Sequence, residues 1–268
     1  MHGSISNSMS EMPSLLERYE LKFVIPERMV DSISDFASVY CRPDRYSEQS
    51  PDGYYSVYSL YFDSPGFLFL RNRLEGVANR FNMRVRAYNK ESGTPCFFEV
   101  KQKRDGITRK YRAKVENENW ECILVRADCG YRGVAEKENT DLFVRLACSH
   151  GALPKVLSSY RRKAWVSAVD DYARVTFDRE LRCQPEERCM LHPDPRRMNA
   201  YDNSTLFAPE CNIILELKCY AAKVPLWMLD LIRYFDLCRC SFSKYVNSMG
   251  AIWEQWGYDH GDRTAAVQ

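Results

Sequence analysis

The sequence predicts an α+β protein in which about eight antiparallel strands form a closed β-barrel, with helices packed outside. Three observations predict this class. Many segments alternate with period two and are separated by turn pairs such as Asp52-Gly53, Ser92-Gly93 and Asp105-Gly106. Only about four segments have helical periodicity, with no regular βαβ alternation. Several strands carry one face that is almost entirely charged.

Length and composition are those of one globular domain. The 268 residues are 45% hydrophobic and carry a net charge of +2, which does not by itself indicate nucleic-acid binding. We expect a disordered leader over 1–13, one domain over 14–257 and a flexible tail over 258–268. No apolar run is long enough to span a bilayer, and the first residues lack a secretory signal, so we expect a cytoplasmic protein with reduced cysteines.

Helices are expected where apolar residues recur every three or four positions. The pattern predicts helices over 26–40, 117–126, 141–149 and 225–237, and a packed C-terminal helix over 249–256. Thr140 is the expected N-cap of the third helix, and Gly151 follows its end.

The strands are expected to place charged side chains on one face and apolar side chains on the other. Arg104-Asp105-Gly106 lies between two such strands and predicts an antiparallel hairpin. The charged faces comprise Arg18, Glu20 and Lys22; Arg84 and Arg86; Glu99, Lys101 and Lys103; Lys110, Arg112 and Lys114; Tyr160 and Arg162; Arg174, Thr176 and Asp178; and Glu216 and Lys218.

For a single strand, a solvated outer face is the ordinary interpretation of such a pattern. Several strands with the same pattern favour a barrel whose charged faces point inward, because the helices can cover only the apolar faces. Like charges about 6 Å apart repel by roughly 2 to 3 kcal/mol at an effective dielectric constant near 20, so an empty lumen of this kind needs anions. A chain of phosphates fits the requirement.

The glutamates among these cations have two interpretations. Ion pairing alone explains at least one of Glu20 and Glu99. Carboxylates beside phosphate oxygens also hold Mg²⁺ or Mn²⁺, and we expect Glu216 first, then Glu99 and Glu20, as the ligands of a divalent metal. The four histidines form no evident nucleophile and base pair, and Asp63 is expected to be a turn residue.

Nine short motifs occur in the order found in a known family. With them, the sequence resembles the triphosphate tunnel metalloenzymes, and among these the VTC-domain polyphosphate polymerases, from about Arg18 to Met249. The motifs begin at Arg18 (RYELK), Tyr61 (YFDS), Arg84 (RVR), Glu99 (EVKQK), Lys110 (KYR), Tyr160 (YRRKA), Arg174 (RVTFD), Leu215 (LELK) and Ser243 (SKY).

The resemblance implies a tunnel in which the γ-phosphate of ATP is transferred to a growing polyphosphate chain with a divalent metal. It implies catalytic roles for Lys22, Arg84, Arg86, Lys101, Arg162 and Lys218. It implies phosphate binding by these six and by Lys103, Lys110, Arg112, Arg174, Ser243 and Lys244. Arg18 stands where tunnel enzymes often have a first glutamate, which favours the VTC branch over the CYTH-type triphosphatases.

Two alternatives stay open at this point. The same lumen could hydrolyse triphosphate or polyphosphate, or it could bind polyphosphate or inositol phosphates without catalysis. The expected partners are therefore ATP or another triphosphate and inorganic polyphosphate, and not nucleic acid, because the basic residues are expected to face inward. The sequence identifies neither a membrane partner nor the oligomeric state.

Overall fold

The computed structural model describes residues 18–88, 94–104, 107–116, 120–125, 134–202 and 211–255. The expected leader and tail lie outside these residues. So do the turns Ser92-Gly93 and Asp105-Gly106, and Trp256.

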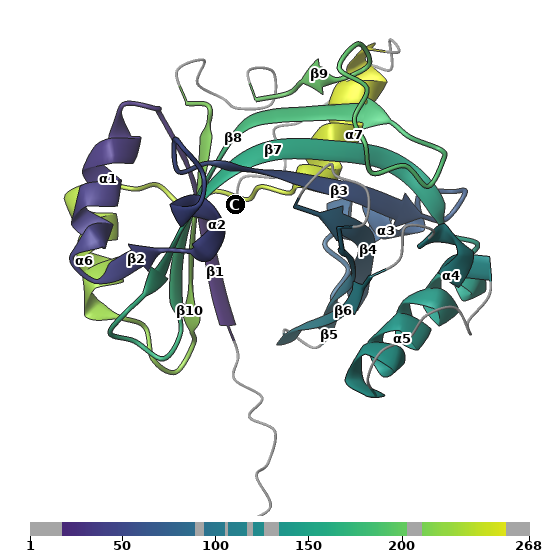
Figure 1. Ribbon diagram of the computed structural model, residues 1–268, viewed down its shortest axis with the longest axis horizontal. Helices are drawn as coiled ribbons and strands as arrows, with labels where there is room; N and C mark the ends of the chain where they lie inside the picture. Colours follow the sequence, from purple (N-terminus) through teal and green to yellow (C-terminus); the bar gives the residue numbers. More distant parts are fainter. Residues whose placement is uncertain are drawn as a thin grey trace, which may run out of the picture.

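One antiparallel sheet organises the described residues (Figure 1). Its path joins eight strands in the order β1-β10-β8-β7-β3-β4-β5-β6, while β2 pairs with β7 and β9 pairs with β8. The strands are β1 (Arg18–Ile25), β2 (Cys41–Pro43), β3 (Tyr55–Asp63), β4 (Arg80–Ala87), β5 (Cys96–Arg104), β6 (Ile107–Val115), β7 (Leu153–Ser167), β8 (Ala173–Pro185), β9 (Asn199–Ala200) and β10 (Ile213–Tyr220).

The expected closed barrel is wrong, because the sheet is an open half-barrel. β1 and β6 are the two ends of the strand path, and within the described residues no ladder joins them. Closing the sheet would bring the two edges to within about 4.8 Å. Lys22 of β1 and Lys110 and Arg112 of β6 carry like charges at these edges. Such charges disfavour closure, and the described sheet is an arch with two walls.

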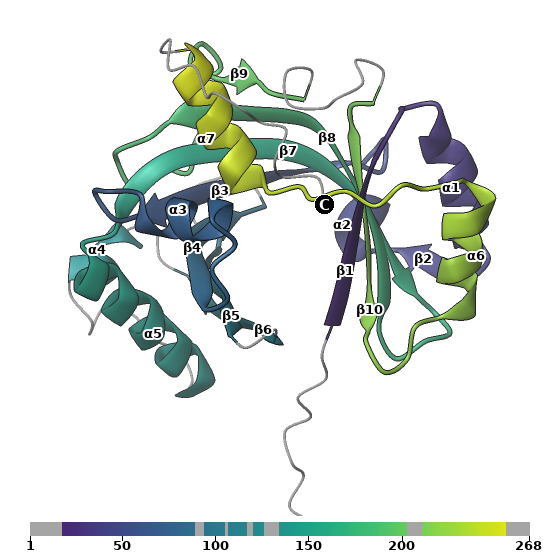
Figure 2. The ribbon, with the colours of Figure 1, turned by 180° about the vertical axis from the view of Figure 1, so that it is seen from behind.

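Helices cover the outer, apolar side of both walls, as the sequence predicts (Figures 1 and 2). α1 (Met29–Ser38) and α6 (Leu226–Tyr234) cover the wall of β1, β10 and β8, which we call the first wall. α4 (Glu121–Val125) and α5 (Val134–His150) cover the wall of β4, β5 and β6, the second wall. α3 (Leu68–Leu74) and α7 (Lys244–Gln255) pack beside the arch, and α2 (Arg45–Glu48) lies near the ends of β2 and β7.

The expected helices are confirmed in position, with shifted ends. The third begins earlier than expected, so Thr140 lies inside α5 and donates from Oγ1 to the Glu136 carbonyl instead of capping the helix. Gly151 follows α5 with φ of 56°, the left-handed conformation in which a helix often ends. The two short helices α2 and α3 were not expected, since neither is long enough to show a period.

The side chains that remain inward are polar, and they define the concave side of the arch.

No helix among the described residues is long and apolar enough to cross a membrane. The cysteines described are free thiols, and Cys41, Cys96, Cys183 and Cys219 among them are buried.

Candidate functional site

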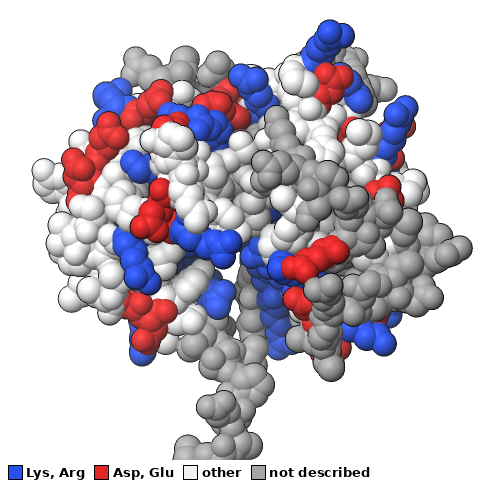
Figure 3. Space-filling model, viewed as in Figure 1, with Lys and Arg blue, Asp and Glu red and all other residues white. Residues whose placement is uncertain are grey.

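Charged side chains from both walls converge on the concave side of the half-barrel (Figure 3). Within the described residues, ten cations are linked by ion pairs to five carboxylates there. The carboxylates are Glu20, Asp44, Glu99, Asp178 and Glu216, and the cations are Lys22, Arg84, Arg86, Lys101, Lys110, Arg112, Arg162, Arg174, Lys218 and Lys244. The site therefore carries an excess of positive charge.

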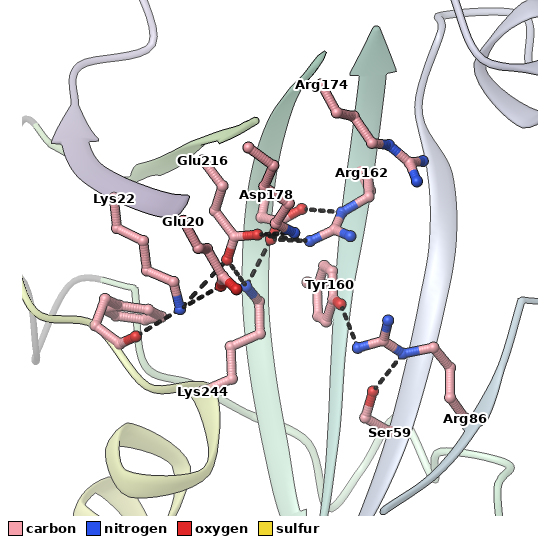
Figure 4. Close-up of polar contacts among 12 residues, drawn as sticks. Glu20, Lys22, Ser59, Arg86, Tyr160, Arg162, Arg174, Asp178, Glu216 and Lys244 are labelled. Atoms are coloured by element: carbon pink, nitrogen blue, oxygen red, sulfur yellow. Dashed lines mark hydrogen bonds and ion pairs between the residues drawn. The ribbon is translucent and has the colours of Figure 1, made fainter. Parts of the chain in front are cut away.

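Glu216 of β10 is the hub of the first wall (Figure 4). Its carboxylate lies 2.7 Å from Lys218 Nζ, 3.5 Å from Lys22 Nζ and 3.6 Å from Lys244 Nζ. The residue is 3% exposed, and burial raises the pKa of its carboxyl, but these positive charges outweigh burial and hold the pKa well below its usual range. Glu216 is therefore an anion at neutral pH.

Asp178 of β8 is a second buried hub, and sequence reasoning missed it. It accepts two hydrogen bonds from the fork of Arg162, at 2.6 and 2.7 Å, and one from Lys244 Nζ at 2.5 Å. Arg162 Nη2 also lies 3.6 Å from Glu216. Alternation along the strand predicted only that Asp178 shares a face with Arg174 and Thr176. Nothing in that pattern shows that Arg162 of the next strand neutralises Asp178.

Tyr160 of β7 connects the two walls at the top of the arch. Its hydroxyl accepts a hydrogen bond from Arg86 Nη2 at 3.3 Å, while Arg86 Nε donates to Ser59 Oγ at 3.3 Å. Lys244 Nζ lies 4.5 Å from the centre of the Tyr160 ring. Arg86 and Lys244 are thus held on opposite sides of one aromatic ring (Figure 4).

Glu99 of β5 is the hub of the second wall. Its carboxylate meets Arg84 Nε at 2.7 Å, Lys110 Nζ at 2.6 Å, Arg112 Nε at 3.5 Å and Arg86 Nη1 at 3.8 Å. Burial raises the pKa of Glu99, but Arg86 and Arg84 lead the positive charges that bring it well below its usual range. Burial, Arg86 and Arg84 lower the pKa of Lys110 to about 8, although Glu99 opposes them.

The open edge of the half-barrel is spanned by an ion pair instead of a β-ladder. Lys101 Nζ of β5 lies 2.9 Å from Glu20 Oε2 of β1, and Glu20 Oε1 lies 3.3 Å from Lys22 Nζ. Both members are partly exposed, at 44% for the Lys101 side chain and 28% for that of Glu20. This contact is weak compared with a ladder of backbone hydrogen bonds.

The remaining expected site residues occupy less central positions. Arg174 lies on the charged face but pairs with Asp44 at 2.5 Å, near α2. Lys103 lies beyond Lys101, one residue before the end of β5, and, among the described residues, belongs to no ion pair of the site. Ser243 immediately precedes α7 and is half-buried, next to the buried Lys244.

Three of these carboxylates are the expected metal ligands, and the structure separates them into two groups. Glu20 and Glu216 both reach Lys22 Nζ, whereas Glu99 lies among cations of the other wall. Among the described residues, the buried Thr176 Oγ1 has no hydrogen-bond partner, and Thr176 is paired with Glu216 across the β8–β10 ladder. Glu20 and Glu216 are hard oxygen donors of the kind that hold a divalent cation sharing phosphate oxygens, and Lys22 Nζ lies at the position that they share. Among the described residues, no three His, Cys, Asp or Glu side chains are grouped so that they could hold a metal ion.

The two described histidines, His150 and His192, take no part in this site. His150 ends α5 and packs against the rings of Phe69 and Phe81. His192 lies in the loop between β8 and β9, and His2 and His260 lie outside the described residues. The chemistry of the site therefore rests on charge and position.

Comparison with known proteins identifies one family. The family model of the VTC domain matches residues 17–252, which is most of the chain. A comparison with curated proteins finds no match.

Three solved structures are distantly similar. A protein of Bacillus halodurans described as a candidate adenylate cyclase is 10% identical, with 84% of this chain and 92% of that chain covered and a TM-score of 0.47. A Pyrococcus horikoshii protein is 11% identical, with 88% and 99% covered and a TM-score of 0.45. A Hippeastrum protein described as a candidate adenylyl cyclase with a dominant triphosphatase activity is 14% identical, with 88% and 96% covered and a TM-score of 0.43. Similarities this distant say nothing about the reaction of the present chain.

Proposed function

Because this chain belongs to the VTC domain family, as its motifs predicted, we propose that it is a metal-dependent phosphotransferase that moves the γ-phosphate of ATP onto a polyphosphate chain. The observation that supports this proposal most strongly is the excess of cations on the concave side of the half-barrel. Counted over the described residues, ten cationic side chains lie there with five carboxylates. A ligand with several closely spaced negative charges relieves their mutual repulsion.

The reaction needs position and charge more than covalent help from side chains. An oxygen of the terminal phosphate of the acceptor chain forms a bond to the γ-phosphorus of ATP. The bond from that phosphorus to the oxygen bridging the β- and γ-phosphates breaks, and its electron pair stays on ADP. The attacking oxygen is already anionic, so the step needs no general base, which agrees with the absence of histidine from the described site.

The residues of the two walls divide this task. On one side, phosphates would be bound by three residues of the second wall, Arg84, Arg86 and Lys110. On the other side, they would be bound by Lys22, Lys218 and Arg162. Lys244, held at 2.5 Å from Asp178 and 3.6 Å from Glu216, lies between these groups and would compensate the charge of the transferred phosphoryl group.

Glu216 and Glu20, with the hydroxyl of Thr176 nearby, would hold the divalent metal. When bound there, the metal neutralises phosphate oxygens and so reduces the repulsion between donor and acceptor chains. Glu99 is a weaker candidate ligand, because four cations already surround its carboxylate.

The test is an assay of the purified chain with ATP and Mn²⁺ or Mg²⁺, followed by electrophoresis with polyphosphate staining. We expect long polymer and stoichiometric ADP. Glu216→Gln should lower the rate at least about 100-fold, because it removes the charge of the central metal ligand while keeping its shape. The matched control is Glu187→Gln, since Glu187 is exposed on the loop after β8 and lies outside the site.

Other outcomes identify the alternatives. Release of orthophosphate without polymer indicates hydrolysis, in which water replaces the acceptor chain. Tight binding of tripolyphosphate with no turnover in any metal indicates a binding protein. Equal rates for Glu216→Gln and the parent chain would exclude the metal role proposed for Glu216.

A further inference from the structure

A small cavity lies on the convex side of the arch, across the sheet from the charged interior. β3, β7 and β8 form its floor, and the loop over 193–198, which leads to β9 above β8 in Figure 1, forms its roof. Side chains alternate along β7, so Ser159 and Arg161 face the cavity while Tyr160 and Arg162 face the charged interior. The cavity volume is about 170 Å³. Sites for drug-sized ligands hold roughly 300 to 1,000 Å³, so this one suits a smaller molecule.

An irregularity in the sheet shapes the floor of the cavity. The register between β7 and β8 shifts at Ser159 and Arg161. Opposite this shift, Glu180 of β8 has φ of 54°, a left-handed conformation that is uncommon for a residue other than glycine. A bulge of this kind bends the strands and changes the direction of nearby side chains, and bulges and strained residues are frequent beside functional sites.

Hydrogen bonds hold the roof in place over the floor. The backbone N–H of Asp194 donates to Oε1 of Gln184, a side chain of β8 that is 1% exposed. Ser159 Oγ of the floor lies 4.0 Å from Met198 Sδ of the roof. The cavity is therefore a preformed part of the fold, as sites for small ligands usually are.

The two halves of the cavity differ in chemistry. Pro193, Pro195 and Met198 make the roof apolar. The floor presents two hydroxyl groups, and within the described ranges that of Ser56 has no hydrogen bond, while that of Ser159 reaches only the sulfur of Met198, a weak acceptor. A ligand that matches both halves has an apolar body and a group that accepts hydrogen bonds.

The charge available to a ligand in this cavity is positive. Arg161 is already paired, with Asp52 at 2.7 Å and Glu180 at 3.7 Å, and Glu180 also meets Arg179 Nε at 3.4 Å. By contrast, Arg182 forms neither an ion pair nor a side-chain hydrogen bond with any residue that the structure describes. Its guanidinium carries a planar fork of donors, which matches the two oxygens of a carboxylate.

We propose that this cavity binds a small organic carboxylate. The carboxylate lies against Arg182 and the hydroxyls of Ser56 and Ser159, and the apolar body lies under the roof. Orthophosphate matches the cavity less well, because some of its oxygens would lose their water against the apolar roof without gaining a partner. The inference does not rest on the proposed function, since the sheet separates the cavity from the charged interior.

The test is nuclear magnetic resonance of the full chain with isotope-labelled methionine methyl groups. Met198 lines the cavity, and Met198→Leu identifies its signal. Benzoate is the probe, and benzamide has the same shape without the charge. We expect benzoate to shift the Met198 signal until it saturates, and benzamide to bind at least about 10-fold more weakly, because a hydrogen bond to a charged group is the stronger one.

Variants then test which residues hold the carboxylate. Arg182→Gln should weaken benzoate binding at least about 10-fold, and Ser56→Ala should weaken it less. The matched control is Arg196→Gln, because Arg196 is exposed on the same loop and does not line the cavity. Lys22→Gln with Lys218→Gln removes two cations of the charged interior and should leave the Met198 response unchanged. Arg182 is exposed, so Arg182→Gln should unfold at the temperature of the parent chain, and a loss of binding is then not a loss of fold.

Four results would overturn the inference. A Met198 signal that does not respond to benzoate shows that no carboxylate binds in the cavity. Equal affinities for benzoate and benzamide remove the carboxylate from the ligand class. A response that survives Arg182→Gln but is lost with Lys22→Gln and Lys218→Gln places benzoate in the charged interior. Tighter binding of orthophosphate than of benzoate at Met198 means that the cavity selects an inorganic anion.

Discussion

At the scale of single residues, the site combines strong positive charge with groups whose pKa is moved away from its ordinary value. Tyr88 is the clearest case near neutral pH. Burial raises the pKa of its phenol, but the positive charges of Arg86 and Arg112 outweigh burial and lower the pKa to about 7. An anionic ligand at these arginines competes with the tyrosinate for the same charges.

This shift predicts a pH dependence of stability. The unfolded chain keeps the Tyr88 proton up to about pH 10, whereas the folded chain loses it near pH 7. The folded state binds fewer protons between these values, so the free energy of unfolding gains a contribution as the pH rises through this window. The contribution is lost as the pH falls through the folded pKa.

The measurement is denaturant unfolding of the parent chain and of Tyr88→Phe between about pH 6 and pH 10. The difference in unfolding free energy should grow with pH in favour of the parent chain. Tyrosinate absorbance should show one tyrosine that titrates near pH 7 and is missing from the variant. A difference that stays flat with pH would contradict the shift.

At the scale of elements, one buried carboxylate fixes the positions of two helices. Asp63, at the end of β3, accepts hydrogen bonds from the backbone N–H groups of Ser64, Phe69 and Leu70. Its Oδ2 also accepts from the Tyr245 hydroxyl at 2.7 Å. Asp63 is indeed at a turn, as the sequence predicts, but it also joins α3 to α7. Since Tyr245 follows Lys244, this contact positions Lys244 against Asp178.

Replacement of Asp63 by Asn should therefore destabilise the fold and weaken the site together. The amide presents N–H groups to N–H and O–H donors, so we expect a loss of about 2 to 4 kcal/mol in unfolding free energy. Phosphate binding should also weaken, because Lys244 loses its anchor. Tyr245→Phe removes one hydrogen bond only and should cost about 1 kcal/mol. If Asp63→Asn leaves stability unchanged, the anchoring role is wrong.

The elements also show what sequence can and cannot predict here. Period two in β1, β5 and β10 predicts which side chains share a face, so the inward position of Lys22, Glu99 and Glu216 was foreseeable. The partners of these residues were not foreseeable. Pairing of β10 with β1 joins segments almost 200 residues apart, and its pairing with β8 joins segments 36 to 46 residues apart. Alternation within a strand encodes neither pairing. Asp178 was missed because its partners Arg162 and Lys244 lie on other elements, which the pattern of its own strand does not identify.

At the scale of the whole molecule, the unpredicted feature is the open edge. Alternation fixes the faces of the strands but not whether the first and last strands of the path meet. Whether these two strands meet depends on the balance between the hydrogen bonds that a β-ladder would add and the repulsion among cations at the edges. In the part of the chain that the structure describes, the ion pair of Glu20 and Lys101, at 2.9 Å, spans the opening.

An excess of cations around an open edge predicts a strong stabilising effect of polyvalent anions. Tripolyphosphate binds the folded state and not the unfolded chain, so the unfolding temperature should rise with its concentration, by about 2.7 kcal/mol in unfolding free energy at 100 times the dissociation constant. Orthophosphate at equal ionic strength is the control, because it carries less charge in one ligand. Lys22→Gln with Lys218→Gln removes two cations of the first wall and should reduce the effect of tripolyphosphate more than that of orthophosphate. Identical shifts for both anions would mean that general salt effects, and not a charged interior shared by the two walls, stabilise the fold.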